Sequence, residues 1–472
     1  MYLNTEYLIR YGDGFLDPIA SNFGLKQGCP LSPMLFNLYI DDICSIFDNS
    51  CDPININGKE INHFLYADDL VILSSSDTGL QIGLDRLYDF ANGKHLTVSI
   101  DKSKTIVFNK TGKLLRREFS IGGSNLEPVR TFCYLGYEIS AGKPNSTALE
   151  VLCDKGTKAM YPLLRTSARF DIPVKTLIRF FEAYVSPIIL YNVENWAEMN
   201  DNKIKEFTKE NFWKGIMEDK ASMVQRKFLK YIMGVTRTCP NAAVMGDTGE
   251  VPLILKGYRL MIQYWNRITN LPDETLVKQA LLENITLRTN WIITVEKLIS
   301  TFNLSHYIES PAKLKYAAER SLRDSYIEFW KINVTNNGRL GFYNTCKNSF
   351  KFEEYLDKQQ FNKRKVLAKL RCSDHDLEIE KGRHRNIARE MRLCKSCVRG
   401  DIENEEHFLF KCDLYNEIRA NTIKNNINIE SLFEGDALEE LVNFVMRALD
   451  KRRDKEVLDY LFTNAILLFT EG

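Results

Sequence analysis

Two segments of the sequence bring together side chains that can bind metal ions. One is the adjacent carboxylate pair Asp68 and Asp69, and the other is a set of three cysteines and one histidine within residues 394–412. Carboxylate oxygens suit hard cations such as Mg²⁺, whereas thiolates and imidazole suit Zn²⁺. The sequence therefore predicts two metal sites of different chemistry, widely separated along the chain.

The acidic pair lies in a predicted β-hairpin, between the apolar runs 64–66 and 70–73. Two carboxylates about 4 Å apart repel each other by roughly 4 kcal/mol at an effective dielectric constant of about 20. Divalent cations remove this repulsion, as in two-metal phosphoryl transfer, where the ions stabilise both the attacking and the leaving oxygen. A bare Asp-Asp pair is more often only a polar turn, but apolar segments on both sides favour a functional site.

The acidic turn and an earlier segment resemble motifs of reverse transcriptases. Residues 66–69, Tyr-Ala-Asp-Asp, resemble the YADD box of that family, and residues 23–33 are similar to the GxxQGxPLSP block that precedes it. The resemblance implies that Gln27, Gly28 and Tyr66 contact the template strand or the incoming nucleotide. Glycine at position 28 also has a physical reason, because the backbone must approach a base pair closely there.

Two downstream segments extend the resemblance. Residues 96–104 look like the LxxNxxKTK motif, with Ser99 and Ser103 where asparagine and threonine are usual, and Lys102 would meet triphosphate charge. Residues 132–136 resemble the YLG turn that positions the primer end. With four motifs in the family's order, the chain is identified as the C-terminal portion of a non-LTR (LINE-like) retrotransposon reverse transcriptase.

The family's palm domain also needs an aspartate on a strand several tens of residues before the QG block. Only 26 residues precede Gln27, and Asp13 and Asp17 lie in a turn-like segment. Asp41 and Asp42 could substitute, but their place on a predicted helix favours simple solvent exposure. We therefore expect one catalytic carboxylate to be absent and the isolated chain to be inactive. The genomic sequence directly upstream would show whether the chain is part of a longer protein.

The second cluster has the spacing of a zinc-binding unit. Cys394 and Cys397 form a CxxC pair, and His407 and Cys412 follow about one helical turn apart. Buried free cysteines with a surface histidine are the alternative interpretation, but the other cysteines are dispersed. The segment also resembles the zinc-binding tail of non-LTR retrotransposon reverse transcriptases. Cys372 and His375 lie nearby and are left out, because the set of four is complete without them.

The overall composition is that of a folded chain with balanced charge. Its 472 residues include 63 lysines and arginines against 62 aspartates and glutamates, and 44% are hydrophobic. This length predicts about two to four domains. The N-terminus lacks a secretory signal, no run of about 18 apolar residues predicts a membrane span, and 11 dispersed cysteines do not suggest a secreted disulfide framework. We therefore expect a protein of the nucleus or cytoplasm with no membrane partner.

Positive charge is concentrated beside the predicted zinc unit. Residues 361–399 hold twelve lysines and arginines against five acidic residues, an excess of seven positive charges. A basic flank next to a small zinc unit suits the phosphates of RNA or DNA, and such binding would weaken steeply with salt. A metal-stabilised unit that contacts protein is the alternative.

Periodicity and turn signals predict an α+β fold. It comprises a partial reverse-transcriptase palm (an antiparallel sheet with helices), then a mainly helical thumb and connector, and a small zinc knuckle. Asn57-Gly58 predicts a tight hairpin, Ser32 is expected to cap a helix, and another helix is expected from Asp77. Further strands are expected at 97–100, 105–108 and 132–138. The predicted domains are the partial palm at 1–142, thumb-like helices at 143–220, the helical connector at 221–380, the CCHC zinc-binding region at 381–420 and a C-terminal helical segment at 421–472.

The resemblance implies an RNA-directed DNA polymerase that copies element RNA into DNA by two-metal nucleotidyl transfer. Its expected cofactors are Mg²⁺ (or Mn²⁺) and Zn²⁺, and its expected partners are an RNA template, a DNA primer and deoxynucleoside triphosphates. The alternative is a catalytically silent RNA- or DNA-binding protein derived from a retroelement. The sequence makes no prediction of the oligomeric state.

Overall fold

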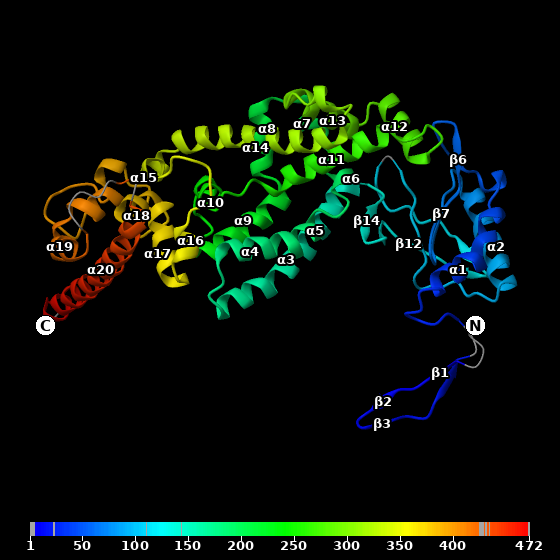
Figure 1. Ribbon diagram of the computed structural model, residues 1–472, viewed down its shortest axis with the longest axis horizontal. Coiled ribbons are helices and arrows are strands. Elements are labelled where there is room, and N and C mark those ends of the chain that lie inside the picture. Colours follow the sequence, from blue (N-terminus) through cyan, green and yellow to red (C-terminus); the bar gives the residue numbers. More distant parts are fainter. Residues whose placement is uncertain are drawn as a thin grey trace. The chain divides into compact units, whose positions relative to one another are not determined.

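A computed structural model of the chain describes residues 5–21, 24–109, 111–142, 144–423, 429, 432–433 and 435–470. It divides into two compact units, which are described separately. Unit 1 comprises Met1–Pro144 and Leu271–Leu287, and unit 2 comprises Asn145–Asn270 and Arg288–Gly472. All the named strands lie in unit 1, whereas unit 2 is built mainly from helices (Figure 1). The five predicted domain boundaries stay a prediction.

The strands of unit 1 pair two by two. The antiparallel pairs are β1 (Thr5–Tyr7) with β4 (Ile19–Ser21), β2 (Arg10–Tyr11) with β3 (Gly14–Phe15), β5 (Ile54–Ile56) with β6 (Lys59–Ile61), β7 (His63–Tyr66) with β8 (Asp69–Ile72), β10 (Ser120–Ile121) with β11 (Ser124–Asn125), and β13 (Thr131–Tyr134) with β14 (Tyr137–Ser140). A parallel pair joins β9 (Lys104–Thr105) and β12 (Glu127–Pro128). The α+β class is thus confirmed, but the described residues do not form one continuous antiparallel sheet. The assignment to a palm stays a prediction.

Helices pack against these hairpins. The helical elements of unit 1 are α1 (Ser32–Ile40), η1 (Asp41–Ile46), η2 (Asn49–Cys51), α2 (Asp77–Gly93) and α12 (Leu276–Thr286). Helix α2 begins at Asp77 as expected, because the Ser76 side chain accepts a hydrogen bond from the Gly79 amide. The expected Ser32 cap is wrong. Ser32 is already helical, and its hydroxyl donates to the Lys26 carbonyl at 2.7 Å.

Two of the expected strands differ in the structure. Residues 97–100 form no strand, and the strand expected at 105–108 is reduced to β9. The alternating pattern has another cause, since Val98 and Ile100 pack on the small core around Leu84 and Phe119 without pairing their backbone. The expected strand at 132–138 is instead the β13–β14 hairpin, with its turn at Leu135-Gly136.

Unit 2 is a succession of helices, many of which begin beside a proline. Its main helices are α3 (Pro144–Arg169), α4 (Val174–Phe180), α8 (Lys209–Met217), α9 (Lys220–Met233), α10 (Asn241–Thr248), α11 (Leu253–Thr269), α13 (Asn290–Thr301), α14 (Pro311–Thr335), α17 (Phe361–Arg371), α18 (Glu378–His384), α19 (Asn416–Thr422) and α20 (Gly435–Thr470). Shorter elements connect them: η3 (Phe181–Val185), α5 (Ser186–Ile189), α6 (Val193–Trp196), α7 (Asp201–Lys205), η4 (Ser305–Tyr307), η5 (Gly338–Leu340), α15 (Gly341–Cys346), α16 (Tyr355–Lys358), η6 (Arg389–Met391), η7 (His407–Lys411) and η8 (Asp413–Tyr415). Among the described residues, no helix is long and apolar enough to cross a bilayer.

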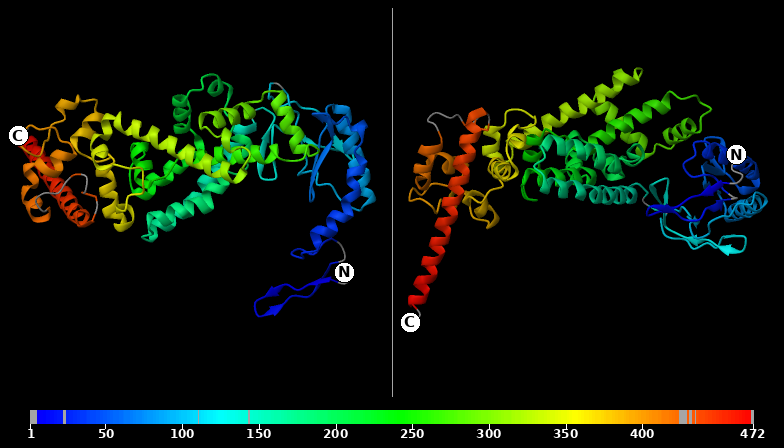
Figure 2. Two further views of the ribbon diagram at one scale, coloured as in Figure 1. Left: turned by 45° about the horizontal axis from the view of Figure 1, so that its top comes forward. Right: turned by 60° about the horizontal axis from the view of Figure 1, so that its bottom comes forward.

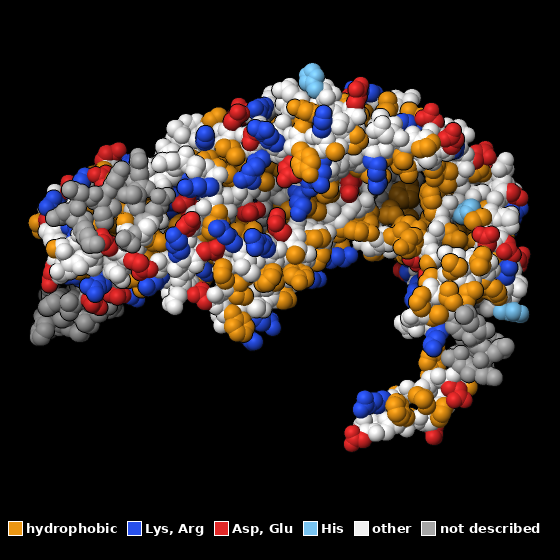
Figure 3. Space-filling view, viewed as in Figure 1, with side chains coloured by type: hydrophobic (Ala, Val, Ile, Leu, Met, Phe, Trp, Pro, Cys, Tyr) orange, Lys and Arg blue, Asp and Glu red, His pale blue; other side chains and the backbone are white. Residues whose placement is uncertain are grey.

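Helix α20 begins beside the small C-terminal elements and continues as a single helix (Figure 2). Its N-terminal half packs against α17 and α19. On the face of unit 2 drawn in Figure 3, lysines and arginines lie among aspartates and glutamates.

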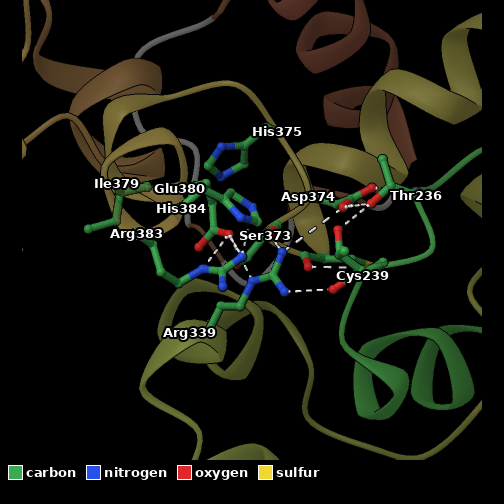
Figure 4. A network of polar contacts seen from close by, with 12 residues as sticks. Thr236, Cys239, Arg339, Ser373, Asp374, His375, Ile379, Glu380, Arg383 and His384 are labelled. Atoms are coloured by element: carbon green, nitrogen blue, oxygen red, sulfur yellow. Dashed lines mark hydrogen bonds and ion pairs between the residues drawn. The ribbon is translucent and has the colours of Figure 1, made fainter. Parts of the chain in front are cut away.

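A polar network joins the turn after α9 to the segment before α18 (Figure 4). Asp374 accepts hydrogen bonds from the amide and the hydroxyl of Thr236. Arg339 donates to the Ser373 carbonyl at 2.7 Å and pairs with Glu380 at 2.8 Å. These contacts fix the position of the segment that leads into the cysteine-rich region.

Candidate functional site

The acidic pair lies at the tip of the β7–β8 hairpin, as the sequence predicted. Tyr66 and Asp69 are the last paired residues of the ladder, and Ala67 and Asp68 form the two-residue turn. Ala67 has φ of +52°, the left-handed conformation that such tight hairpin turns require. Tyr66, Asp68 and Asp69 are all exposed. The turn therefore presents both carboxylates to solvent at one end of the hairpin.

The base of the hairpin is held by an apolar face. Leu65 and Leu70 are cross-strand partners, and together with Ile72 they pack on the buried core formed by Ile43 and Phe47. The opposite face carries Tyr66 and Asp69, because successive side chains of a strand point to alternate faces. This anchoring explains why apolar residues flank an exposed acidic turn.

The β13–β14 hairpin lies within electrostatic range of the acidic pair. Burial and, to a smaller extent, the negative charge of Asp69 raise the pKa of Tyr134. Tyr134 immediately precedes the Leu135-Gly136 turn, where both residues have positive φ. The structure thus brings together two of the segments that the sequence singled out.

The remaining predicted residues, Gln27, Gly28 and Lys102, are exposed. Gly28 has φ of +81°, which favours glycine for a reason other than the expected approach to a base pair, and Gln27 and Lys102 lie on the surface. Among the described residues, no hydrogen bond or ion pair joins Gln27, Gly28 or Lys102 to the acidic pair. Within the same residues, no third carboxylate, cysteine or histidine completes a metal-binding group with Asp68 and Asp69.

The cysteine-rich region gathers its four predicted ligands. One ligand atom from each of Cys394, Cys397, His407 and Cys412 lies within 4.8 Å of the others. The Cys394 and Cys412 sulfurs are 3.9 Å apart, and the Cys397 sulfur lies 3.5 Å from the His407 Nε2. A tetrahedral zinc ion with Zn–S bonds of about 2.3 Å requires sulfurs about 3.8 Å apart. The residues present therefore fit a tetrahedral metal ion.

Local backbone structure explains how the ligands converge. An isolated antiparallel bridge pairs Leu393 with Ile402, and it closes the loop that carries the CxxC pair. The Ser396 amide points to the Cys394 sulfur at 3.4 Å. His407 opens the short π-helical element η7, and Cys412 follows directly after it. One closed loop and one helical turn thus supply two ligands each.

Electrostatics also favours metal binding by this cluster. Burial lowers the pKa of His407, which keeps the imidazole neutral and its Nε2 lone pair available. The other ring nitrogen faces Asp401 at 3.5 Å, an arrangement that orients metal-bound histidines. The hydrogen bond from Cys394 lowers the pKa of Cys412. Of the Cys394 and Cys412 thiols, that of Cys412 is therefore ionised more readily.

His375 remains outside the cluster, as predicted. Its Nε2 lies 3.0 Å from the Glu405 carboxylate, which also accepts a hydrogen bond from Ser373. Sequence reasoning missed the two buried glutamates of this loop, Glu403 and Glu405. Both glutamates lie between the two ligand pairs, and the sequence shows this. The residues that they contact lie too far away along the chain to be inferred from it.

Much of the predicted basic flank is used inside the fold. Arg364 and Arg371 are buried, and Arg392 donates to two backbone carbonyls. Five further members pair with nearby carboxylates: Lys363 with Glu439, Arg383 with Glu380, Arg385 and Lys395 with Glu378, and Arg399 with Asp413. Glu378 and Glu380 are already subtracted in the excess of seven charges. The excess is reduced further by Lys363, Arg371 and Arg399, because these pair with Glu439, Asp247 and Asp413 outside residues 361–399.

Comparison with known proteins agrees with the sequence motifs. Residues 3–139 match the family described as "Reverse transcriptase (RNA-dependent DNA polymerase)". This segment, which contains the acidic hairpin, is of the reverse-transcriptase class.

The relatives that the chain resembles are polyproteins of retrotransposable elements. The chain is 31% identical over 139 residues to the Retrovirus-related Pol polyprotein from type-2 retrotransposable element R2DM of Drosophila melanogaster, over 28% of this chain and 13% of that polyprotein. It is 31% identical over 138 residues to a type-1 R2 polyprotein of Popillia japonica, over 27% of this chain and 19% of the relative. A type-1 R2 polyprotein of Nasonia vitripennis is 31% identical over 149 residues, 30% of this chain and 14% of the relative.

The chain is thus a relative of the LINE-like reverse transcriptases of non-LTR retrotransposons. The aligned segments span less than a quarter of the length of these relatives.

Proposed function

We propose that the chain contributes the acidic hairpin of an RNA-directed DNA polymerase, which copies the RNA of a non-LTR retrotransposon into DNA. The observation that carries this proposal is the tight β7–β8 turn, which presents Asp68 and Asp69 within a segment matched by the reverse-transcriptase family. The partners would be an RNA template, a DNA primer and deoxynucleoside triphosphates.

The roles of the residues follow from their chemistry. Asp68 and Asp69 would hold Mg²⁺ or Mn²⁺, because exposed carboxylate oxygens suit hard cations that keep some of their waters. Held by these carboxylates, the ions would supply activation of the primer hydroxyl and neutralisation of the leaving pyrophosphate. Tyr66 and Gly28 would face the primer–template and nucleotide, and Lys102 would meet triphosphate charge. Two-metal transfer also needs a further carboxylate ligand, and none joins Asp68 and Asp69 among the described residues.

The metal-binding step can be tested without turnover. Mn²⁺ is titrated into the chain with an RNA–DNA primer–template and a nucleotide, and free Mn²⁺ is followed by electron paramagnetic resonance. We expect Asp68→Asn and Asp69→Asn to weaken binding at least about tenfold, since each removes one charged ligand. Asp41→Asn is the matched control, an exposed acidic residue on η1 of the same unit. Equal affinities in all four proteins would reject the proposal and favour a silent nucleic-acid-binding protein.

We further propose that the cysteine-rich cluster holds a structural zinc ion with Cys394, Cys397, His407 and Cys412 as ligands. Protein side chains would fill all four coordination positions of the zinc ion, which is typical of structural rather than catalytic zinc. Free thiols persist in a reducing compartment, which supports a place in the nucleus or cytoplasm.

Native mass spectrometry tests the zinc site. We expect one zinc ion per chain in the wild type and none in Cys412→Ser. Cys44→Ser, which changes an exposed cysteine of unit 1, is the control and should retain the ion. A wild-type chain purified with zinc present but carrying none would refute the site.

A further inference from the structure

Helix α20 contacts the zinc cluster through side chains that no sequence motif indicates. Arg452, near the middle of this helix, is 7% exposed and pairs with both carboxylate oxygens of Glu403, one of them at 3.0 Å. Glu403 is 1% exposed, and its Oε1 lies 3.5 Å from the Cys394 sulfur. A continuous chain of buried polar contacts thus runs from a metal ligand to α20.

Glu403 also fixes a second element. Its other carboxylate oxygen accepts a hydrogen bond at 2.7 Å from the amide of Glu378, the first residue of α18. The Ile379 amide donates to the Glu403 carbonyl at 3.0 Å. The position of Glu403 is therefore determined from two sides, by α18 and by Arg452.

Apolar contacts place α20 on the same cluster. Phe444 of α20 packs against Phe408 and Tyr415, with ring centroids 5.7 and 6.3 Å apart. Phe408 directly follows the ligand His407, and Tyr415 lies three residues after the ligand Cys412. One turn beyond Arg452, Lys455 donates to the Ser396 carbonyl, inside the CxxC turn, at 3.1 Å. The helix therefore touches both halves of the ligand set.

Charge explains why Arg452 is needed. Zn²⁺ with three thiolates and a neutral imidazole carries a formal charge of −1, and Glu403 adds a second buried negative charge beside it. Arg452 compensates one of these charges within the same buried region. Without it, an uncompensated carboxylate would face the thiolates, and burial makes such a charge costly.

We propose that Arg452 is a positioning residue of the metal centre, which acts through Glu403 to couple metal binding to the docking of helix α20. This inference rests on the zinc site proposed above. Coupling is reciprocal, so that if docking of α20 raises metal affinity by some factor, metal binding favours docking by the same factor.

The first test compares zinc affinity in two neighbouring arginine variants of the full chain. Affinity is measured by competition with a chromophoric zinc chelator. Loss of a group that is hydrogen-bonded directly to a metal ligand weakens metal binding about 10- to 100-fold. Arg452 acts one contact further out, through Glu403, so we expect Arg452→Met to weaken zinc binding by about 10-fold, the lower end of that range. Arg453→Met is the matched control on the same helix, since Arg453 is 74% exposed and pairs only with Asp450 among the described residues. Its affinity should equal that of the wild type.

A second test uses the wild type alone and so does not depend on variant folding. Hydrogen exchange of amides 435–455 is measured with zinc bound and after chelation. We expect chelation to speed exchange in this segment, while α3 in the same unit stays unchanged. Unchanged exchange in 435–455, or Arg452→Met binding zinc as tightly as Arg453→Met, would overturn the coupling while leaving the zinc site intact. Absence of zinc from the wild type would instead refute the site itself.

Discussion

Replacement of Asp247 by asparagine is expected to destabilise unit 2 by about 4 kcal/mol, because it removes one of four mutually compensating buried charges. Asp247 is 0% exposed and lies 3.2 Å from the Arg371 guanidinium and 3.9 Å from the Lys347 ammonium. Glu353 pairs with both of these cations. Two carboxylates therefore balance two cations inside the helical unit.

The magnitude follows from what the substitution leaves behind. Removal of one partner of a buried ion pair costs about 3–5 kcal/mol, since the other charge stays buried without compensation. Asp247 also accepts hydrogen bonds from the hydroxyls of Tyr343 and Tyr355, at 3.0 and 2.7 Å. The amide nitrogen of asparagine cannot accept a hydrogen bond, so one of the two tyrosine hydroxyls would lose its acceptor. These costs overlap, so that their combined effect is about 4 kcal/mol rather than their sum.

Urea unfolding followed by tryptophan fluorescence measures the effect, because the indole of Trp330 donates to the Ala242 carbonyl beside this network. The control is Asp324→Asn, which loses only an exposed pair with Arg320 and should cost less than about 1 kcal/mol. Adding Lys347→Met to Asp247→Asn restores the charge balance and should recover part of the loss. A cost for Asp247→Asn equal to that of the control would refute the reasoning.

Three further predictions concern a buried carboxyl, a close contact and catalysis. Burial and the neighbouring Glu182 raise the pKa of Glu250 to about 7, so that the folded state holds a proton that the unfolded state loses above about pH 4.5. The free energy of unfolding should therefore fall by roughly 3 kcal/mol between pH 4.5 and 7. Thermal unfolding at several pH values measures this dependence, and Glu250→Gln should flatten it. A pH dependence that is the same in Glu250→Gln and the wild type would contradict the prediction. Gly79→Ala would place a Cβ 2.6 Å from the Cys51 carbonyl oxygen, so chemical denaturation of unit 1 should show a loss of about 1–3 kcal/mol in its free energy of unfolding. Gly93→Ala on the same helix is the control, because its Cβ would meet nothing within 4 Å. Since no third carboxylate joins Asp68 and Asp69 among the described residues, primer extension on an RNA template with Mg²⁺ or Mn²⁺ should give no template-dependent product. A product that is lost in Asp68→Asn would disprove this.

Local signals predicted the elements that carry the acidic site. The Asn57-Gly58 turn and the hairpin around Asp68 form as expected, with φ of +47° and +86° in the first. Such turns depend on a few adjacent residues, which the sequence contains in full. The four zinc ligands converge for a related reason, because their spacing within 19 residues already limits the geometry.

The failures arise where distant partners decide the outcome. Val98 and Ile100 alternate like a strand, but they fill a small core without a neighbouring strand to pair with. The charges of residues 361–399 suggested a phosphate-binding surface, yet three of them pair with carboxylates that the fold brings from outside this stretch, those of Asp247, Glu439 and Asp413. Arg452 lies 49 residues after Glu403, and no periodicity or motif links the two.

The central claim is that the β7–β8 turn is the site at which a nucleotidyl-transfer enzyme binds its divalent cations. Iron-directed cleavage tests it most directly: Fe²⁺ replaces Mg²⁺ in the presence of primer–template and nucleotide, and ascorbate with peroxide generates radicals that cut the nearby backbone. We expect fragments that end near residues 66–69 in the wild type and in Asp41→Asn, and we expect these fragments to be lost in Asp68→Asn. Cleavage that leaves this turn uncut, or that persists unchanged in Asp68→Asn, would contradict the claim.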